Sequence, residues 1–175
     1  MIQLEKMRVY IGVGSNLNDP VAQVKTALAA LDALPETCSV QHSSLYRSAP
    51  LTLDAAVMQP DYINAVAALD TRLEPIQLLA ELQVLERCQG RTRGAQRWEA
   101  RTLDLDLLLY ADRQYKSEEL TVPHPRLHER SFVLYPLFEI APDLHVPGQG
   151  SVRDLAAYCR IHDTLSCSPL CMTSS

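Results

Sequence analysis

Residues 103–110, which read LDLDLLLY, constrain the fold of this chain more tightly than any other segment. Successive side chains of a strand point to opposite faces of its sheet, so Asp104 and Asp106 share one face, with Cα atoms ~6.6–7 Å apart. The alternate leucines from Leu103 to Leu109 then point the other way, toward helices packed on the sheet. Two carboxylates on one strand face repel each other, so we expect a positive group beside them.

The order of the periodic apolar segments predicts an α+β fold. Residues 8–110 contain six predicted elements in the order β-α-β-β-α-β: strand 8–14, helix 20–34, strand 38–46, strand 63–71, helix 75–89 and strand 103–110. This is the order of the ferredoxin-like split βαβ unit. We therefore predict a ferredoxin-like α/β sandwich in which two helices cover one face of a mostly antiparallel sheet, with an additional C-terminal hairpin and helices.

Capping residues predict where the first two helices begin and end. Asp19 before Pro20 is a typical N-cap followed by a proline at the first helical position, and Gly90 suits the C′ position of the second helix. Three shorter elements are predicted after residue 110: a strand at 120–122, a helix at 128–135 that Pro136 ends, and a last helix at 152–159.

The chain is predicted to contain one domain. Its 175 residues fit the usual size of one domain and can bury a core without a metal or a disulfide. Residues from Ile161 onward have no periodic pattern. We therefore expect a single domain at 8–160, a short N-terminal extension at 1–7 and a mobile tail at 161–175.

The cysteine pattern and the absence of long apolar segments favour a cytoplasmic protein. Five widely spread cysteines do not form a disulfide framework. Cys167 and Cys171 with His162 are an incomplete set of metal ligands, so free thiols are the simpler interpretation. The sequence contains neither a secretory h-region nor an uncharged apolar stretch of ~18 residues, so no membrane partner is expected.

Positive charge is concentrated in one short segment of an acidic chain. The formal net charge of −5 argues against a general nucleic-acid binder. Of 13 arginines, five fall within residues 87–101: Arg87, Arg91, Arg93, Arg97 and Arg101. Arginine forms bidentate contacts to phosphate or carboxylate, so this segment is a candidate anion site. The alternative is a solvated loop, or ion pairs with Glu81, Glu86 and Glu99.

The Arg-rich segment directly precedes the paired carboxylates, and this combination indicates phosphoryl transfer. Mg²⁺ binds one or two carboxylates together with substrate phosphate oxygens, and cationic side chains neutralise the charge that develops in the reaction. Because D-x-D is short, a solvated strand face is the alternative. No P-loop pattern is present. GVGSNL at 12–17 lacks the third glycine of a dinucleotide fingerprint, so we interpret its glycines as a tight strand-to-helix turn.

Four residues are candidates to bind a flat heteroaromatic ligand. Aromatic residues make up only 6 % of the chain. Trp98 nevertheless falls in a polar segment and Tyr62 next to Pro60. Aromatic faces at Trp98, Tyr62 and Phe132, with the amide of Asn64, suit such a ligand.

Six motifs follow one another in collinear order over residues 8–160: GVGSNL at 12–17, YRSAPL at 46–51, QPDYINA at 59–65, RWEARTLDLDLL at 97–108, VPHPR at 122–126 and LYPLFEIAP at 134–142. Together they resemble the 6-hydroxymethyl-7,8-dihydropterin pyrophosphokinases of folate biosynthesis. Several motifs in register are far more specific than any one of them alone.

The resemblance implies a monomeric enzyme that transfers diphosphate from ATP to 6-hydroxymethyl-7,8-dihydropterin, giving AMP and the pterin diphosphate. It implies two Mg²⁺ ions on Asp104 and Asp106, which are catalytic together with Arg91 and Arg101. ATP contacts are implied for Gln83, Glu86, Leu107, Thr121, His124, Arg130 and Arg93, which shares a closing loop with Arg91. Pterin contacts are implied for Ser48, Leu51, Asn64, Trp98, Tyr62 and Phe132, with the ring between the last two.

Four positions depart from the resemblance. The family usually has Gly or Ala at Glu99, Pro at Ala49, an aromatic residue at Pro125 and a basic residue at Glu119. Because the carboxylates, arginines and stacking aromatics are intact, we expect an active enzyme. The alternatives are a ferredoxin-like RNA-binding module with an Arg-rich loop and a different metal-dependent nucleotidyl or glycosyl transferase.

Overall fold

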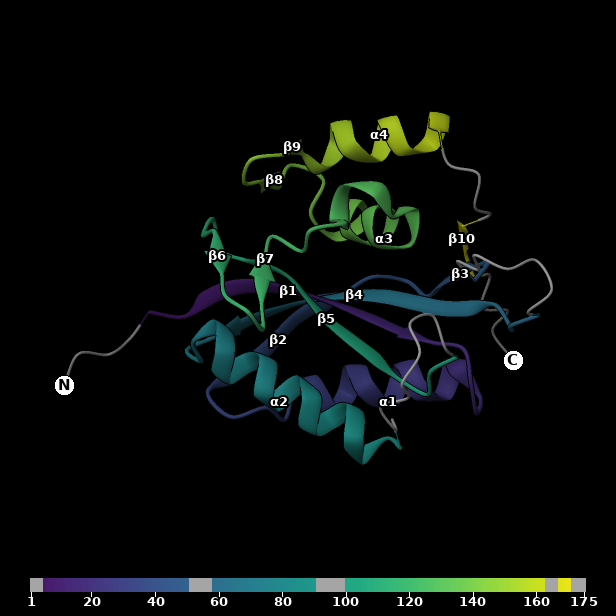
Figure 1. The fold of residues 1–175 in the computed structure, drawn as a ribbon, viewed down its shortest axis with the longest axis horizontal. Coiled ribbons are helices and arrows are strands. Elements are labelled where there is room, and N and C mark those ends of the chain that lie inside the picture. The colour runs from purple at the N-terminus through teal and green to yellow at the C-terminus, as the bar shows by residue number, and fades with distance from the viewer. Residues whose placement is uncertain (1–4, 51–57, 91–99, 163–166, 171–175) are drawn as a thin grey trace.

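The computed structural model describes residues 5–50, 58–90, 100–162 and 167–170 (Figure 1). Its elements are β1 (Met7–Ser15), α1 (Pro20–Leu31), β2 (Thr37–His42), β3 (Tyr46–Ser48), β4 (Tyr62–Thr71), α2 (Pro75–Cys88), β5 (Asp104–Tyr110), β6 (Tyr115–Lys116), β7 (Thr121–Val122), a 3₁₀ turn (Leu127–Glu129), α3 (Ser131–Ile140), β8 (His145–Val146), β9 (Gly150–Ser151), α4 (Val152–His162) and β10 (Cys167–Pro169). The predicted α+β class is confirmed.

The main sheet is built around β4, its ten-residue strand. The strands lie in the order β10-β3-β4-β1-β5, β2 also pairs with β4, and every pair is antiparallel. The single strand expected at 38–46 is divided into β2 and β3. Between them, the backbone N–H of Ser43 donates to Val66 O at 2.9 Å, and Val66 N–H donates to Ser43 Oγ at 3.0 Å. The hydroxyl thus replaces a backbone partner where the ladder is interrupted.

Helices α1 and α2 cover one face of this sheet, as predicted (Figure 1). The helix α1 begins with the expected cap, since the Asp19 carboxylate accepts a hydrogen bond from Ala22 N at 3.2 Å. The buried residues of this layer repeat at helical spacing and pack on alternate strand residues: Val24, Ala27 and Leu31 of α1, Leu78 and Leu82 of α2, and Val9, Ile11, Ala67 and Leu69 of the sheet.

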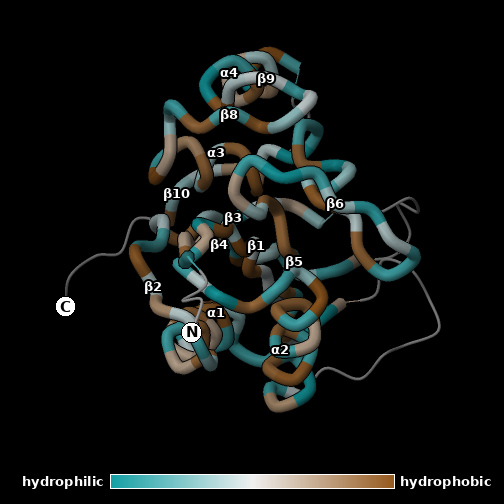
Figure 2. Tube along the Cα trace, turned by 90° about the vertical axis from the view of Figure 1, so that its left-hand side faces the viewer, coloured by the Kyte–Doolittle hydropathy of each residue, from teal (hydrophilic) through white to brown (hydrophobic). Residues whose placement is uncertain are grey.

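Helices α3 and α4 lie on the opposite side of the sheet, with α4 stacked on α3 (Figures 1 and 2). The expectation that Pro136 ends α3 is wrong, because the helix continues to Ile140 with Pro136 inside it. A proline in a helix removes one hydrogen bond and is unfavourable in isolation. Burial of Val133, Leu134 and Leu137 against the sheet and α4 outweighs that local cost.

A bulge in β5 overturns part of the predicted strand pattern. Tyr10 pairs with Leu109 and Ile11 with Leu107, so Leu108 is an extra residue in the ladder. The extra residue reverses the alternation, and Leu109 packs on the α3 side rather than on the α1 and α2 side. Leu105 and Leu107 lie on the predicted side.

The C-terminal region differs from the expected unpatterned tail. Helix α4 extends past Ile161 to His162, and β10 pairs with β3. Residues 163–166 and 171–175 lie outside the described part of the chain. Among the helices that the structure describes, none combines the length and the apolar character needed to cross a membrane.

Candidate active site

The α3 side of the sheet changes from apolar to polar along its length. Tyr10, Val66 and Ala68 pack beneath α3. Further along the same strands, every second residue is instead small or polar: Gly12 and Gly14 on β1, Asn64 on β4, and Asp104 and Asp106 on the neighbouring β5. These five residues line a cavity of about 430 Å³ in this uncovered part of the sheet.

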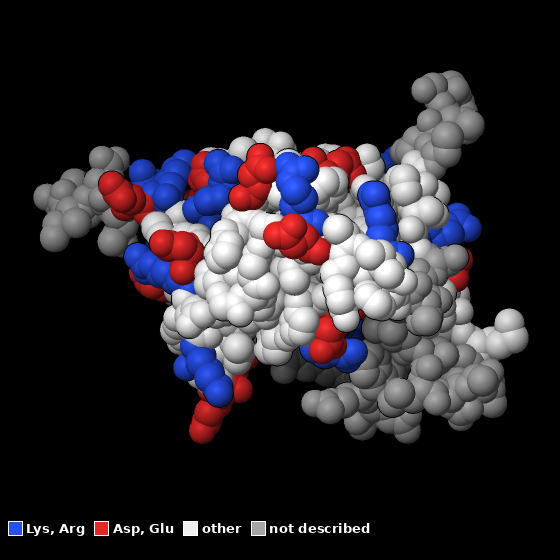
Figure 3. Space-filling model, turned by 90° about the horizontal axis from the view of Figure 1, so that it is seen from above, with Lys and Arg blue, Asp and Glu red and all other residues white. Residues whose placement is uncertain are grey.

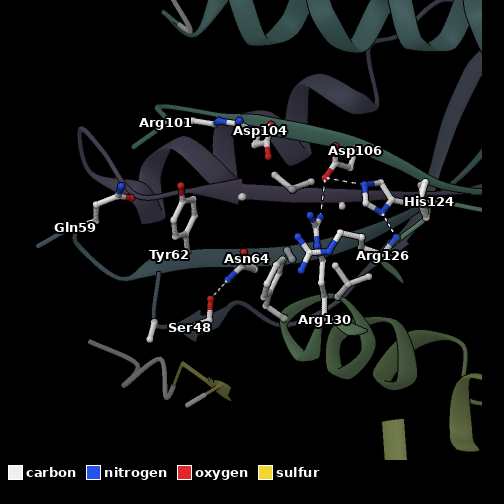
Figure 4. Close-up of a pocket in the computed structure, with 18 residues that line it drawn as sticks. Ser48, Gln59, Tyr62, Asn64, Arg101, Asp104, Asp106, His124, Arg126 and Arg130 are labelled. Atoms are coloured by element: carbon white, nitrogen blue, oxygen red, sulfur yellow. Dashed lines mark hydrogen bonds and ion pairs between the residues drawn. The ribbon is translucent and has the colours of Figure 1, made fainter. Parts of the chain in front are cut away.

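The opposite wall of the cavity comes from the segment between β7 and α3. Among the described residues, those that line the cavity are Gly12, Val13, Gly14, Ser48, Ala49, Gln59, Tyr62, Asn64, Ala65, Arg101, Asp104, Asp106, His124, Pro125, Arg126, Arg130, Phe132 and Val133. Figure 4 shows the carboxylates of β5 facing the guanidinium and imidazole groups of this wall. The cavity therefore joins residues from six separate parts of the sequence.

One end of the cavity holds the two carboxylates and their cationic neighbours. Arg101 Nη1 lies 2.8 Å from Asp104 Oδ1, while Arg130 Nη1 lies 3.6 Å from Asp106 Oδ2. His124 Nε2 lies 4.0 Å from the same oxygen of Asp106. The positive group expected beside the paired carboxylates is therefore present, and it consists of two arginines.

Burial and the neighbouring charges change the protonation of two groups in this acidic end. Burial, followed by repulsion from Asp104, raises the pKa of Asp106 to about 7, although Arg130 opposes the change. Burial, followed by the charge of Arg130, lowers the pKa of His124 to about 4. His124 is therefore neutral at pH 7, and an added cation would stabilise the ionised pair of carboxylates.

Backbone contacts hold these side chains in place. The buried Glu86 carboxylate of α2 accepts a hydrogen bond at 2.8 Å from Leu105 N, between the two aspartates. The amide of His124 donates at 2.9 Å to the carbonyl of Leu108, which is the bulged residue of β5. The bulge therefore fixes the wall segment against the strand that holds the carboxylates.

The other end of the cavity combines an aromatic side chain with a buried amide. Tyr62 and Asn64 come from β4, and the Asn64 amide donates to Ser48 Oγ of β3 at 2.9 Å. Phe132 lines the cavity from α3, with the Arg130 guanidinium carbon 5.6 Å from its ring centroid. A Cβ atom at Gly14 would lie 3.3 Å from Asn64 Oδ1, so glycine leaves the amide room here.

The structure brings most of the predicted site residues together. Nine of them line the cavity: Ser48, Tyr62, Asn64, Arg101, Asp104, Asp106, His124, Arg130 and Phe132. Four do not line the cavity. Leu107 is buried on the α1 and α2 side of the sheet, and the Glu86 carboxylate accepts a hydrogen bond from Leu105 N. Gln83 on α2 and Thr121 on β7 also lie outside the lining. Leu51, Arg91, Arg93 and Trp98 lie outside the described residues.

Sequence reasoning did not predict nine of the 18 lining residues as site residues, among them Gly12, Gly14 and Arg126. Gly12 and Gly14 belong to β1 and form part of the cavity floor, so their interpretation as a strand-to-helix turn is wrong. Gly12 and Gly14 are two residues apart in a strand, as Asp104 and Asp106 are, and this spacing is the sequence signal that predicts a shared face. Arg126 is part of the VPHPR motif but was assigned no role.

The donor set at the acidic end fits a divalent cation. Within residues 5–50, 58–90, 100–162 and 167–170, no group of three or more His, Cys, Asp or Glu side chains has the arrangement of a metal site. Among the described residues that line the cavity, the acidic ones are Asp104 and Asp106, and a pair suits Mg²⁺ because that ion is commonly held by one or two carboxylates and by substrate phosphates.

The α+β fold and a cavity with carboxylates and arginines at one end and an aromatic–amide pocket at the other define a class of enzyme that handles phosphate groups. Comparison with known proteins makes the assignment specific. Residues 10–142 match the 7,8-dihydro-6-hydroxymethylpterin-pyrophosphokinase (HPPK) family, and the chain belongs to this family.

Relatives of similar length agree with this assignment. The chain is 47% identical over 160 residues to a 2-amino-4-hydroxy-6-hydroxymethyldihydropteridine pyrophosphokinase of Haemophilus influenzae, covering 91% of this chain and 98% of that protein. It is also 47% identical over 152 residues to the Pseudomonas aeruginosa protein of the same name, covering 87% and 91%.

A solved structure supports the fold. A Plasmodium falciparum HPPK-DHPS structure matches with a TM-score of 0.70 at 14% identity, over 90% of this chain. The chain spans 46% of the length of that protein. At this low identity the likeness supports the α+β fold alone.

Proposed function

We propose that this protein transfers the terminal diphosphate of ATP to 6-hydroxymethyl-7,8-dihydropterin, giving AMP and the pterin diphosphate. The observation that carries the proposal is the two-ended cavity, in which Asp104 and Asp106 lie next to Arg101 and Arg130 while Asn64 and the aromatic residues line the same space. Family membership and the names of the two bacterial relatives agree with it.

The aromatic end suits the pterin. Ser48 and Asn64 form a polar pair whose remaining donors and acceptors can match the edge of a pterin ring. Tyr62 and Phe132 supply aromatic faces for the ring itself. In this proposal Leu51 and Trp98, from segments outside the described residues, complete the pterin contacts.

The acidic end suits the phosphates. Asp104 and Asp106 would hold two Mg²⁺ ions, which would supply positive charge to the phosphates of ATP. Arg101 and Arg130 lie beside these carboxylates and would bind phosphate oxygens of the same nucleotide. We assign Arg91 and Arg93 to the triphosphate as well. We also propose that Gln83, Glu86, Leu107 and Thr121 contribute to the ATP site.

The reaction requires alignment and charge neutralisation more than a strong base. The hydroxymethyl oxygen of the pterin attacks the β-phosphorus in line, and the bond from that phosphorus to the oxygen shared with the α-phosphorus breaks. AMP leaves with that oxygen, and the hydroxyl proton passes to the end of the cavity that holds Asp104 and Asp106. His124 contributes as a hydrogen-bond donor, because its Nδ1 accepts from Arg126 N at 3.2 Å and its Nε2 therefore carries the proton. Its low pKa keeps it neutral, so it orients an oxygen without adding a charge.

The competing functions are less compatible with the described part of the structure. An RNA-binding module of this fold would present aromatic side chains on an open sheet face. Here α1 and α2 cover one face, α3 covers part of the other (Figure 1), and the remaining part is a cavity floor that carries two carboxylates. On the face seen in Figure 3, basic and acidic side chains lie near one another rather than forming one basic surface. Nucleic acid is therefore not proposed as a partner.

The test is incubation of the protein with Mg²⁺, ATP and 6-hydroxymethyl-7,8-dihydropterin, followed by separation of the nucleotides. Formation of AMP in proportion to pterin diphosphate supports the proposal. ADP as the product would indicate transfer of one phosphoryl group, and release of pyrophosphate would indicate nucleotidyl transfer. We propose residues 8–160 as the catalytic domain. We also propose that its active form is a monomer, and light scattering under the assay conditions tests this oligomeric state.

A further inference from the structure

Arg126 lines the cavity, but its side chain has no part in the function described so far. It directly precedes the 3₁₀ turn at Leu127–Glu129, and Figure 4 shows it beside His124 on the wall that faces the carboxylates. Residues three apart in a 3₁₀ turn are eclipsed, which brings Arg126 Nε to 3.1 Å from Glu129 Oε2. This arginine therefore lies at the cavity while being held by an acidic residue that does not line it.

The three arginines of the described cavity differ in their acidic neighbours. Arg101 and Arg130 lie against Asp104 and Asp106, inside the cavity. The Glu129 that pairs with Arg126 is half exposed, as is Arg126 itself, with side-chain exposures of 51% and 44%. Exposed ion pairs of this kind contribute little, so an anion that enters the cavity can replace Glu129 as a partner of Arg126 at small cost.

Contacts through His124 place Arg126 at the phosphate end of the cavity. His124 Nε2 lies 4.0 Å from Asp106, and His124 Nδ1 accepts from the Arg126 amide at 3.2 Å. In Figure 4, Asp106 on β5 faces His124, and Arg126 lies beside His124 on the opposite wall. A phosphate group held between the carboxylates and this wall would therefore lie in the cavity that Arg126 lines.

We propose that Arg126 binds the polyphosphate of ATP, and that Glu129 holds its guanidinium near the cavity until the nucleotide arrives. The inference rests on the proposed function and adds a binding residue to it. Arginine suits this role because its planar donors match two phosphate oxygens at once. The backbone contact to His124 is independent of the Arg126 side chain, so a substitution tests the guanidinium alone.

The experiment measures binding with Mg²⁺ and α,β-methylene ATP, whose α–β bridge cannot be cleaved in this reaction. Loss of one charge-assisted contact in R126Q is expected to weaken that binding about 10- to 100-fold, with pterin binding unchanged and the KM for ATP raised in parallel. E129Q should bind the analogue at least as tightly as the natural chain. R153Q is the matched control, since Arg153 is an exposed, ion-paired arginine that does not line the cavity.

Three results would overturn the proposal: unchanged analogue binding in R126Q, equal losses of analogue and pterin binding in R126Q, or an E129Q variant as weak as R126Q. The last two would mean that the pair only supports the local structure. Absence of AMP formation by the natural chain is a separate result that counts against the proposed function, because binding of the analogue is measured without turnover.

Discussion

Substitution of Asn16 by alanine should lower both stability and activity, because this buried side chain joins two segments next to the cavity. Asn16 is 1% exposed. Its Oδ1 accepts from Arg101 N at 2.8 Å, and its Nδ2 donates to Pro60 O at 3.2 Å. Arg101 pairs with Asp104, and Gln59 next to Pro60 lines the cavity.

The expected magnitude follows from the polar groups that N16A leaves without this partner. A buried donor or acceptor that loses its partner costs about 1–3 kcal/mol. Arg101 N and Pro60 O are only partly enclosed, so we expect a total of about 2–3 kcal/mol from the two. At about 2–4 °C per kcal/mol for a chain of this size, the midpoint of thermal unfolding should fall by about 4–12 °C.

The assay combines thermal unfolding with the rate of AMP formation. Arg101 keeps one backbone bond to Asn16, from Asn16 N to its carbonyl at 3.1 Å, so its guanidinium should shift rather than leave. A displacement on the order of 1 Å near the reacting groups lowers kcat by about 100-fold. The control is Q41A, which removes an exposed amide that donates to Ile140 O at 2.8 Å. If N16A melts no lower than Q41A, the reasoning about Asn16 is refuted.

Three further predictions concern the cavity itself. D106A should abolish AMP formation while the far-ultraviolet circular dichroism stays unchanged, and turnover near the natural rate would contradict the role of the paired carboxylates. G14A should weaken pterin binding about fivefold, measured by ligand fluorescence, because its Cβ would crowd Asn64 Oδ1 at 3.3 Å and disturb one hydrogen bond of about 1 kcal/mol. Folding raises the pKa of Asp106 from 3.8 to about 7, so the protonated side chain favours the folded state. This contribution to the free energy of unfolding is complete below pH 3.8 and is lost as the pH rises through about 7. Without ligands, D106N should therefore melt higher than the natural chain at pH 8, with the difference shrinking toward pH 5; a constant difference would contradict the shift.

Local patterns predicted the elements well where local physics decides them. The N-cap at Asp19 and the helix end before Gly90 depend on neighbouring residues only, and both are confirmed. The end of α3 was predicted wrongly because burial of its apolar side chains outweighs the cost of Pro136. The bulge at Leu108 depends on the register between β5 and β1, which no pattern within one strand reveals.

The site was predictable to the extent that its residues alternate along a strand or belong to a motif. The spacing of Asp104 and Asp106 alone places both on one face of the strand, and this face lines the cavity. The partner across the cavity, Arg130, comes from a segment more than twenty residues away, so only the resemblance to a family indicated it. Arg126 remained without a role because its position depends on the 3₁₀ turn that follows it.

The uncovered part of the sheet has a consequence for how this protein tolerates change. Where α3 packs, strand residues contribute to the core, but beyond it Gly12, Gly14 and the two aspartates contribute little apolar burial. Asp104 and Asp106 also repel each other there. Selection for heat resistance alone would thus favour a neutral side chain in place of Asp106, and such a variant would lose the chemistry. Stability and activity oppose each other along this stretch of the sheet.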